Sequence, residues 1–160
     1  MLIRKAVPSD LETLVQISID GEVDEDKIQY PRKTKARIIK EKKPSHYKKA
    51  LLKEMKQKNM HFVVVEEGGE IAGFGQAYLK KYRGGVYFAD MVGEIGRVYI
   101  KKKFRGRGIG TKLIRYLINH LKKKGVKVVL SYTYTKNRPS LRVHHKLGFR
   151  EEAYKLVKKI

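Results

Sequence analysis

The sequence predicts an α/β fold with a mixed, partly parallel central sheet and helices on both faces of that sheet. Three observations support it: strand and helix patterns alternate along the chain, residues 61–80 have the pattern of a hairpin, and residues 85–135 read as strand, helix, strand. A hairpin gives antiparallel strands, whereas a helical crossover joins parallel ones. The length of 160 residues fits one domain, so we expect a single domain over residues 1–160.

Each element of the first half has its own signal. An apolar alternation predicts the first strand, helical spacing predicts two helices, and Gly68-Gly69 supplies the turn of the hairpin. The segment between the two helices changes from acidic to basic with little period, which predicts a connection. The expected elements are a strand at 2–7, a helix at 9–20, a connection at 21–43, a helix at 44–58 and the hairpin at 61–80.

The second half begins with a long strand at residues 85–100. Gly93 and Gly96 interrupt it, which indicates a bulge or a close approach of another backbone. From Gly108, apolar residues recur at helical spacing until Gly125, which is suited to end a helix. The remaining elements are expected to be a strand at 126–135, a short helix at 138–148 and one short C-terminal strand at 149–160.

Composition limits the classes of function. The chain has 38 Lys and Arg against 16 Asp and Glu, a formal net charge of +22, which favours an anionic partner: nucleic acid, anionic lipid or a phosphorylated cofactor. The absence of cysteine excludes disulfides, thiolate metal sites and a cysteine nucleophile. The five histidines lack metal-ligand spacing, so we expect no metal. Without a signal-peptide pattern or a long apolar run, we expect a cytoplasmic protein with no membrane partner.

Residues 101–111, "KKKFRGRGIGT", join the long strand to the following helix and contain three glycines. The spacing of those glycines fits neither the Walker loop nor the dinucleotide fingerprint. What remains is the chemistry that both motifs share, because glycines let a ligand approach the backbone and the amides of residues 106–111 precede a helix with a positive N-terminal end. The segment is therefore suited to bind a pyrophosphate.

The motif "RGRGIG" resembles the [Arg/Gln]-x-x-Gly-x-[Gly/Ala] acyl-coenzyme A loop of the GNAT N-acetyltransferase superfamily. A second segment, "NRPSLRVHHKLGF", is similar to the Asn-x-x-Ala-x-x-x-Tyr-x-Lys-x-Gly-Phe signature of the same superfamily, and the order of elements is similar from Leu2 to Phe149. The matching residues are Arg105, Gly108 and Gly110 in the first motif, and Asn137, Ser140, Lys146, Gly148 and Phe149 in the second.

The resemblance implies a GNAT-like fold and transfer of an acetyl group from acetyl-CoA, as co-substrate, to a primary amine by direct attack. It implies that strand backbone pairs with the pantetheine arm, that the amide of Val98 donates to the thioester oxygen, and that the loop amides hold the pyrophosphate. The implied coenzyme-binding residues are Val98, Tyr99, Ile100, Arg105, Gly106, Arg107, Gly108, Ile109, Gly110, Thr111 and Asn137.

Two catalytic residues follow from the same comparison. Glu94 lies eleven positions before Arg105, where some superfamily members place a general base, and Asp90 is the reserve. The tyrosine that protonates the leaving thiolate in the superfamily is replaced here by His144, which can donate a proton when it is cationic. Tyr132 and Tyr134 offer alternative hydroxyls for that role.

The acceptor amine and the partners stay open at this point. Acidic residues at positions 22, 24, 25 and 26 lie where the superfamily binds its acceptor, and they suit a polyamine, a lysine or N-terminal tail, or another small amine. Two alternatives compete with the enzyme: a basic nucleic-acid-associated protein, favoured by the charge, and a non-catalytic acyl-CoA sensor, favoured by the missing tyrosine. Pairing through the terminal strand would give a homodimer.

Overall fold

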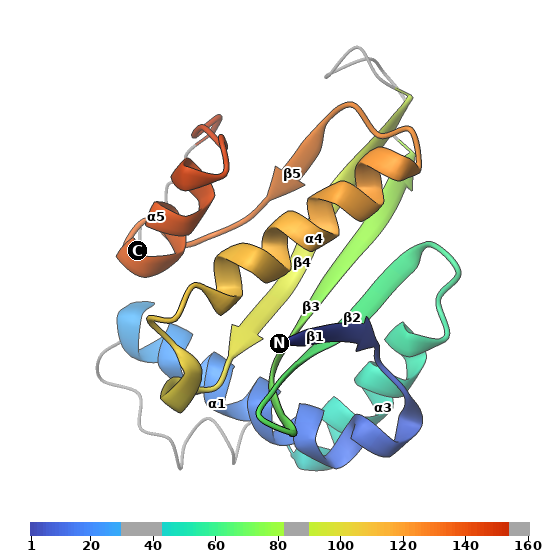
Figure 1. The fold of residues 1–160 in the computed structure, drawn as a ribbon, viewed down its shortest axis with the longest axis vertical. Helices are drawn as coiled ribbons and strands as arrows, with labels where there is room; N and C mark the ends of the chain where they lie inside the picture. The colour runs from blue at the N-terminus through green and yellow to red at the C-terminus, as the bar shows by residue number, and fades with distance from the viewer. Residues whose placement is uncertain (30–42, 82–89, 154–160) are drawn as a thin grey trace, which may run out of the picture.

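A five-stranded mixed sheet forms the centre of the protein (Figure 1). The structure is a computed structural model and describes residues 1–29, 43–81 and 90–153. Neighbouring strands from β1 to β4 are antiparallel, whereas β5 runs parallel to β4, so the predicted partly parallel sheet is confirmed. In spatial order, the strands are β1 (Leu2–Lys5), β2 (Met60–Glu67), β3 (Glu70–Lys81), β4 (Met91–Ile100) and β5 (Val129–Ser131).

Helices cover both faces of the sheet, as the sequence predicts (Figure 1). Successive side chains of a strand point to opposite faces. Phe62 and Val64 of β2 accordingly join the core under α1 and α3, whereas Val63 and Val65 join the core under α4. The helices are α1 (Leu11–Gln29), α3 (Pro44–Met55), α4 (Ile109–Lys123) and α5 (Arg138–Lys146). None of the helices within the described ranges has the length and apolar character needed to cross a membrane.

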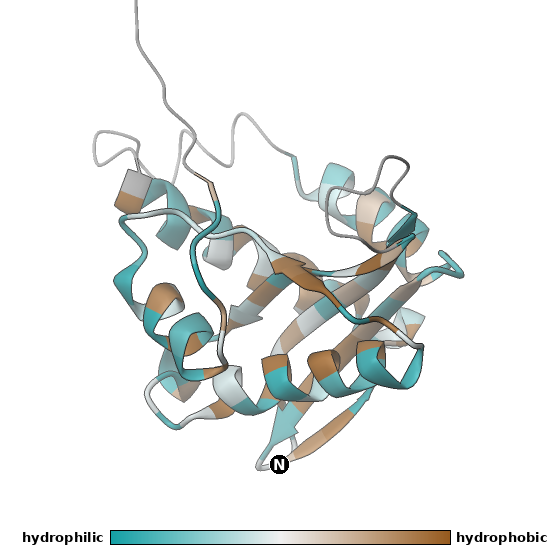
Figure 2. Ribbon diagram, turned by 90° about the horizontal axis from the view of Figure 1, so that it is seen from above, coloured by the Kyte–Doolittle hydropathy of each residue, from teal (hydrophilic) through white to brown (hydrophobic). Residues whose placement is uncertain are grey.

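Helix α4 lies close to the sheet because glycines lie beneath it. Its buried face presents Leu113, Leu117 and Leu121, and Figure 2 shows hydrophobic and hydrophilic residues alternating along the helices. A Cβ atom at Gly93 would lie 2.7 Å from the side chain of Leu121, and one at Gly75 would lie 2.9 Å from Leu117. The group that approaches Gly93 closely is therefore a side chain, that of Leu121, rather than the backbone that the sequence suggested.

Strand β4 contains a bulge in its middle. Gly75 of β3 pairs with Val98 and Ala77 pairs with Ile95, so two residues of β4, Gly96 and Arg97, oppose the single residue Gln76 of β3. Pairing of β4 with β5 ends at Ile95, immediately before the bulge. The two parallel strands therefore separate where the bulge turns β4, and this separation positions the site described below.

The largest differences from the sequence expectations lie at three boundaries, and residues 85–89 of the expected long strand lie outside the described residues. Helix α1 continues through the acidic segment to Gln29, because buried Val23 anchors it and Gly21 lets it cross the ring of Tyr99; a Cβ at Gly21 would lie 2.6 Å from that ring. Strand β5 is three residues long rather than ten, since β4 is within pairing distance only before the bulge. Residues 149–153 form no strand, and the rest of the expected C-terminal strand lies outside the described residues, as do residues 30–42 of the expected connection.

Candidate active site

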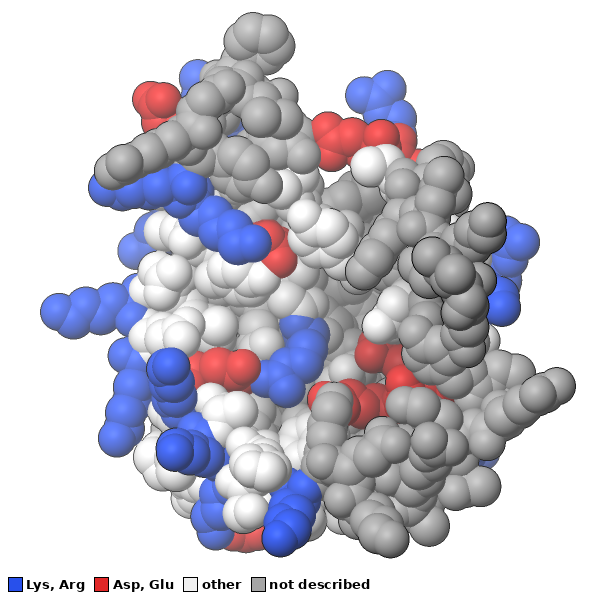
Figure 3. All heavy atoms as spheres, turned by 180° about the vertical axis from the view of Figure 1, so that it is seen from behind, with Lys and Arg blue, Asp and Glu red and all other residues white. Residues whose placement is uncertain are grey.

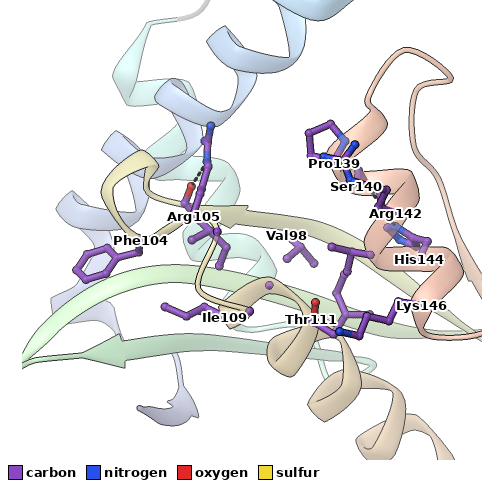
Figure 4. Close-up of a pocket in the computed structure, with 16 residues that line it drawn as sticks. Val98, Phe104, Arg105, Ile109, Thr111, Pro139, Ser140, Arg142, His144 and Lys146 are labelled. Atoms are coloured by element: carbon purple, nitrogen blue, oxygen red, sulfur yellow. Dashed lines mark hydrogen bonds between the residues drawn. The ribbon is translucent and has the colours of Figure 1, made fainter.

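Two cavities meet at the point where β4 and β5 separate. One, the loop cavity, has a volume of about 430 Å³ and lies between the β4–α4 loop and α5; the other, the splay cavity, has a volume of about 460 Å³ and lies between β4 and the segment after β5. Both are lined by Val98, Ser140 and His144. In Figure 4, Val98 lies between the loop residues on one side and the α5 residues on the other. A ligand in the loop cavity can thus reach a second molecule in the splay cavity.

The β4–α4 loop presents free backbone amides to the loop cavity. Gly106 and Gly108 have φ values of +79° and +76°, in the left-handed region that favours glycine, and Gly108 caps the N-terminus of α4. Among the described residues, the amides of residues 106–111 have no backbone acceptor, and the first such bond of α4 runs from Lys112 N to Gly108 O. These amides and the positive end of α4 form a cradle suited to a phosphate group.

Arg105 braces this loop with its side chain. Its Nε donates to the backbone oxygen of Ile100 at 2.8 Å, drawn as a dashed line in Figure 4, and its Nη1 lies 2.6 Å from Oδ2 of Asp24 on α1. The guanidinium therefore ties the loop to the end of β4 and to α1. Arg105 thus lines the loop cavity and holds the cradle in place through these two contacts.

The structure brings together most of the coenzyme-binding residues expected from the sequence. Tyr99 lines the splay cavity, with its side chain buried. Arg107 lies outside both cavities, with its guanidinium over the ring of Phe104, and Asn137 also lies outside, with its side-chain oxygen accepting from Ser140 N at 3.2 Å to cap α5. Those that line the loop cavity are Val98, Ile100, Arg105, Gly106, Gly108, Ile109, Gly110 and Thr111.

Glu94, the expected base, is buried in the wall of the splay cavity. Its Oε1 accepts a hydrogen bond from the hydroxyl of Tyr78, and its Oε2 forms an ion pair with Lys80, both from β3. Burial and this hydrogen bond raise the pKa of Tyr78. Glu94 is thus a fixed carboxylate facing the cavity, whereas Asp90 is exposed just before β4 and lies outside the lining of either cavity.

A second carboxylate, Glu25, reaches the splay cavity from α1. It accepts a hydrogen bond from the hydroxyl of Tyr99 at 3.1 Å. Burial raises the pKa of the Glu25 carboxyl, and burial also raises that of the Tyr99 hydroxyl. A carboxylate whose pKa is raised binds a proton more readily, so Glu25 is chemically suited to accept one.

His144, the expected acid, is 8% exposed and lines both cavities. Its Nδ1 lies 2.8 Å from the backbone oxygen of Ser140, and its Nε2 lies 2.8 Å from Oγ of Ser131. The ring also packs edge-on against Phe149, with 5.1 Å between centroids. These contacts fix the orientation of the imidazole at the junction of the two cavities.

Sequence reasoning missed the residues that hold the catalytic candidates. Tyr78, Lys80 and Ser131 have no motif around them, and only the pairing of β3, β4 and β5 brings them to the site. Tyr132 and Tyr134, the alternative acids, line the splay cavity but are 76% and 45% exposed, so neither is a core residue.

The parallel strands of the mixed sheet separate at a bulge, and a glycine loop leads into a helix N-terminus at this opening. This arrangement is that of the acetyltransferase-like folds. The model of the acetyltransferase (GNAT) family matches residues 25–149 of the chain. The chain belongs to the GNAT acetyltransferase family.

The individual relatives have low sequence identity to this chain. The chain is 34% identical over 89 residues to a mycothiol acetyltransferase of Thermobifida fusca, which covers 55% of this chain and 28% of that protein. It superposes with a TM-score of 0.76 and 26% identity on a transcriptional regulator of Bacillus halodurans, over 99% of both chains. The PaiA N-acetyltransferase of Thermoplasma acidophilum in complex with coenzyme A gives a TM-score of 0.78 at 21% identity, over 96% of this chain and 92% of that one.

These relatives support the family and the fold and leave the substrate open. The chain spans little more than a quarter of the length of the mycothiol enzyme, and at 21% identity the PaiA structure supports the fold alone.

Proposed function

We propose that this protein is an N-acetyltransferase that transfers an acetyl group from acetyl-CoA to a primary amine by direct attack. The observation that carries the proposal is the junction of the loop cavity and the splay cavity at Val98, Ser140 and His144. Two substrates entering from different sides would meet there, as a reaction without a covalent acyl-enzyme requires.

The loop cavity is the proposed site of the coenzyme. The amides of residues 106–111 would hold the pyrophosphate, and a methyl group at Gly108 would point into open space that a phosphate can fill. The backbone of β4 beyond the bulge is left unpaired by β5, so Val98, Tyr99 and Ile100 can pair with the pantetheine arm. Bound acetyl-CoA supplies an activated acyl group, and the amide of Val98 is the proposed donor to its carbonyl oxygen.

The splay cavity is the proposed site of the amine. An ammonium ion cannot attack a thioester, so a base must first remove a proton. Glu94 is the proposed base, in the position that the family resemblance assigns to it, and Glu25 is a second carboxylate in the same cavity. His144 supports protonation of the leaving thiolate from the opposite wall.

Cationic acceptors fit this cavity best among the amines considered. Glu25 and Glu94 line it, and α1 carries further carboxylates near Glu25: Asp24 bonds to Arg105, and Glu22 accepts a hydrogen bond from Tyr47 at 2.7 Å. A polyamine, or a lysine or N-terminal tail, brings a second positive charge that these carboxylates attract.

The rival functions have less support. On the face seen in Figure 3, acidic side chains lie among the described Lys and Arg side chains, which does not favour a nucleic-acid-binding stripe. A non-catalytic sensor requires the loop cavity to bind the coenzyme, but it does not require a general base such as the buried Glu94. Both alternatives separate from the enzyme in the experiment below.

The experiment is a thiol-release assay with acetyl-CoA and a panel of acceptors: polyamines, lysine peptides, N-terminal peptides, amino acids and aminoglycosides. Calorimetry with CoA accompanies it, using Gly108→Glu as the variant, since a carboxylate in the cradle would repel the diphosphate. We expect CoA binding and acceptor-dependent thiol release by the wild type, and neither by the variant. CoA binding without release for any acceptor would identify a sensor, and no CoA binding would refute the proposal.

A further inference from the structure

Both ring nitrogens of His144 are already engaged by other residues. Nδ1 lies 2.8 Å from the backbone oxygen of Ser140, and because a carbonyl oxygen can only accept, Nδ1 carries a proton. Nε2 lies 2.8 Å from Oγ of Ser131. The buried imidazole therefore has no nitrogen left to contact the sulfur of a bound coenzyme directly.

Ser131 carries a hydroxyl in the wall of the splay cavity, beside the junction at which the two substrates are proposed to meet. It is the last residue of β5 and pairs with Ile95 immediately before the bulge of β4. It lines the splay cavity together with Val98 and His144, two of the residues at which this cavity meets the loop cavity. The Ser131 hydroxyl thus lies next to His144 Nε2 in the wall of the splay cavity.

We propose that Ser131 is the catalytic acid of this site and that His144 is the positioning residue which supplies its proton. The inference rests on the transferase reaction proposed above and names the group that completes it. It also gives a role to the histidine that stands in place of the family tyrosine, because Ser131 supplies the hydroxyl that a histidine lacks.

The proposed step balances in atoms and charge. The nitrogen of the neutral amine forms a bond to the thioester carbon and loses its surplus proton to a carboxylate of the splay cavity, Glu94 or Glu25. The carbon–sulfur bond breaks, and its electron pair goes to sulfur. The hydroxyl proton of Ser131 moves to that sulfur while the Nε2 proton of cationic His144 moves to Oγ of Ser131. The products are the amide, the free thiol, a protonated carboxyl group and neutral His144; the carboxyl group then releases its proton to solvent water, and His144 takes one from it.

A route for that solvent proton exists beside the pair. A third cavity, of about 260 Å³, is lined by Ser131 and His144 and also by His145 and Glu151, which form an exposed ion pair at 2.8 Å. Glu94 is not among the residues that line this third cavity. The charged groups that line the three cavities around His144 are Glu25, Glu94, Arg97, Arg105, Arg142, Lys146, Arg150, Glu151 and Glu152.

The same hydrogen bond is also the arrangement of a serine nucleophile with its base. In that mechanism neutral His144 would take the proton of Ser131, and Oγ would attack the thioester to form an acetyl-serine. The acid and nucleophile roles differ in a measurable way, because only the second leaves an acetyl group on the protein when no amine is present.

The test compares Ser131→Ala, Ser131→Thr, His144→Phe and the double variant Ser131→Ala/His144→Phe with the wild type. We expect Ser131→Ala and His144→Phe each to lower kcat by about 10²-fold, the lower end for general acid catalysis, because a thiol is a good leaving group. The double variant should be no slower than the single ones, since the pair acts as a unit. Ser131→Thr should recover most of the activity, because threonine keeps the hydroxyl.

Two further readouts separate catalysis from structure. The deficit of Ser131→Ala should shrink as the pH rises through about 8.5, where a thiolate no longer needs a proton to leave. CoA affinity by calorimetry should stay at the wild-type value. Ser18→Ala serves as a control, because it removes a buried hydroxyl bonded to Leu14 O, away from all three cavities, and should change stability without changing the pH profile.

Several outcomes would overturn the relay. Wild-type kcat in Ser131→Ala, a deficit independent of pH, or multiplied losses in the double variant each refute it while the transferase proposal stands. An acetyl group found on Ser131 by mass spectrometry, after mixing with acetyl-CoA alone, replaces the acid role with the nucleophile role. Absence of thiol release by the wild type with every acceptor refutes the transferase function, and the relay falls with it.

Discussion

Replacing Gly108 by alanine tests the phosphate cradle against a matched site in the same helix. Gly108 precedes α4 with a φ of +76°, and Gly125 follows α4 with a φ of +79°. A Cβ atom at either position would find no heavy atom within 4 Å. The two substitutions therefore impose the same backbone strain without a clash, and only Gly108 borders the loop cavity.

The expected magnitudes follow from that geometry. A left-handed conformation costs a non-glycine residue roughly 1–2 kcal/mol, which lowers the melting temperature of a chain of this size by about 2–8 °C. Gly108→Ala and Gly125→Ala should share this loss. In Gly108→Ala the methyl group also pushes a phosphate away from the loop amides, and losing one charge-assisted hydrogen bond, about 1.5–3 kcal/mol, weakens CoA binding roughly 10–100-fold.

Thermal unfolding and calorimetry with CoA measure the two effects separately. Gly125→Ala should bind CoA as the wild type does, and Gly108→Ala should bind it far more weakly at the same stability. Wild-type CoA affinity in Gly108→Ala would refute the cradle. An equal loss of affinity in both would show that general destabilisation, rather than contact with the loop, controls binding.

Three further predictions concern titratable side chains. Glu94→Gln should lower turnover by ~10²–10⁴ at unchanged CoA affinity, and wild-type turnover would exclude Glu94 as the base. Glu25→Gln should raise KM for a cationic acceptor more than for a neutral amine, and equal changes would place the acceptor elsewhere. His61 of β2 stacks on His120 of α4, with 3.6 Å between centroids, and burial lowers the pKa of His61 to about 4. Because the unfolded chain binds this proton first, the free energy of unfolding should fall by about 1–2 kcal/mol as the pH drops from about 6.5 to 4, an effect that His61→Gln should remove in denaturant titrations.

Local patterns predicted the elements whose residues decide their own conformation. The apolar stripe of α4, the glycine turn of the β2–β3 hairpin and the glycines of the loop all have a short-range physical cause, and each is found where the sequence indicates. The bulge at Gly96 was also predicted, because a strand glycine signals such an irregularity. The family resemblance added the order of the elements and the motif positions.

Other boundaries depended on residues far apart in the chain. Helix α1 extends through the acidic segment because Gly21 packs against Tyr99, a contact across 78 positions that no local pattern contains. Strand β5 ends at Ser131 because β4 bends away at its bulge. Neither end is encoded in the propensity of the residues next to it.

The sequence by itself therefore determined the class of fold and the glycine loop after β4, and the family resemblance of its motifs marked Glu94 and His144 as candidates. Only the tertiary structure decided how those side chains are held: Tyr78 and Lys80 on Glu94, and Ser131 on His144. The physical reason is that a buried polar group must find its partner in space, and sheet pairing and helix packing, rather than chain neighbours, supply that partner.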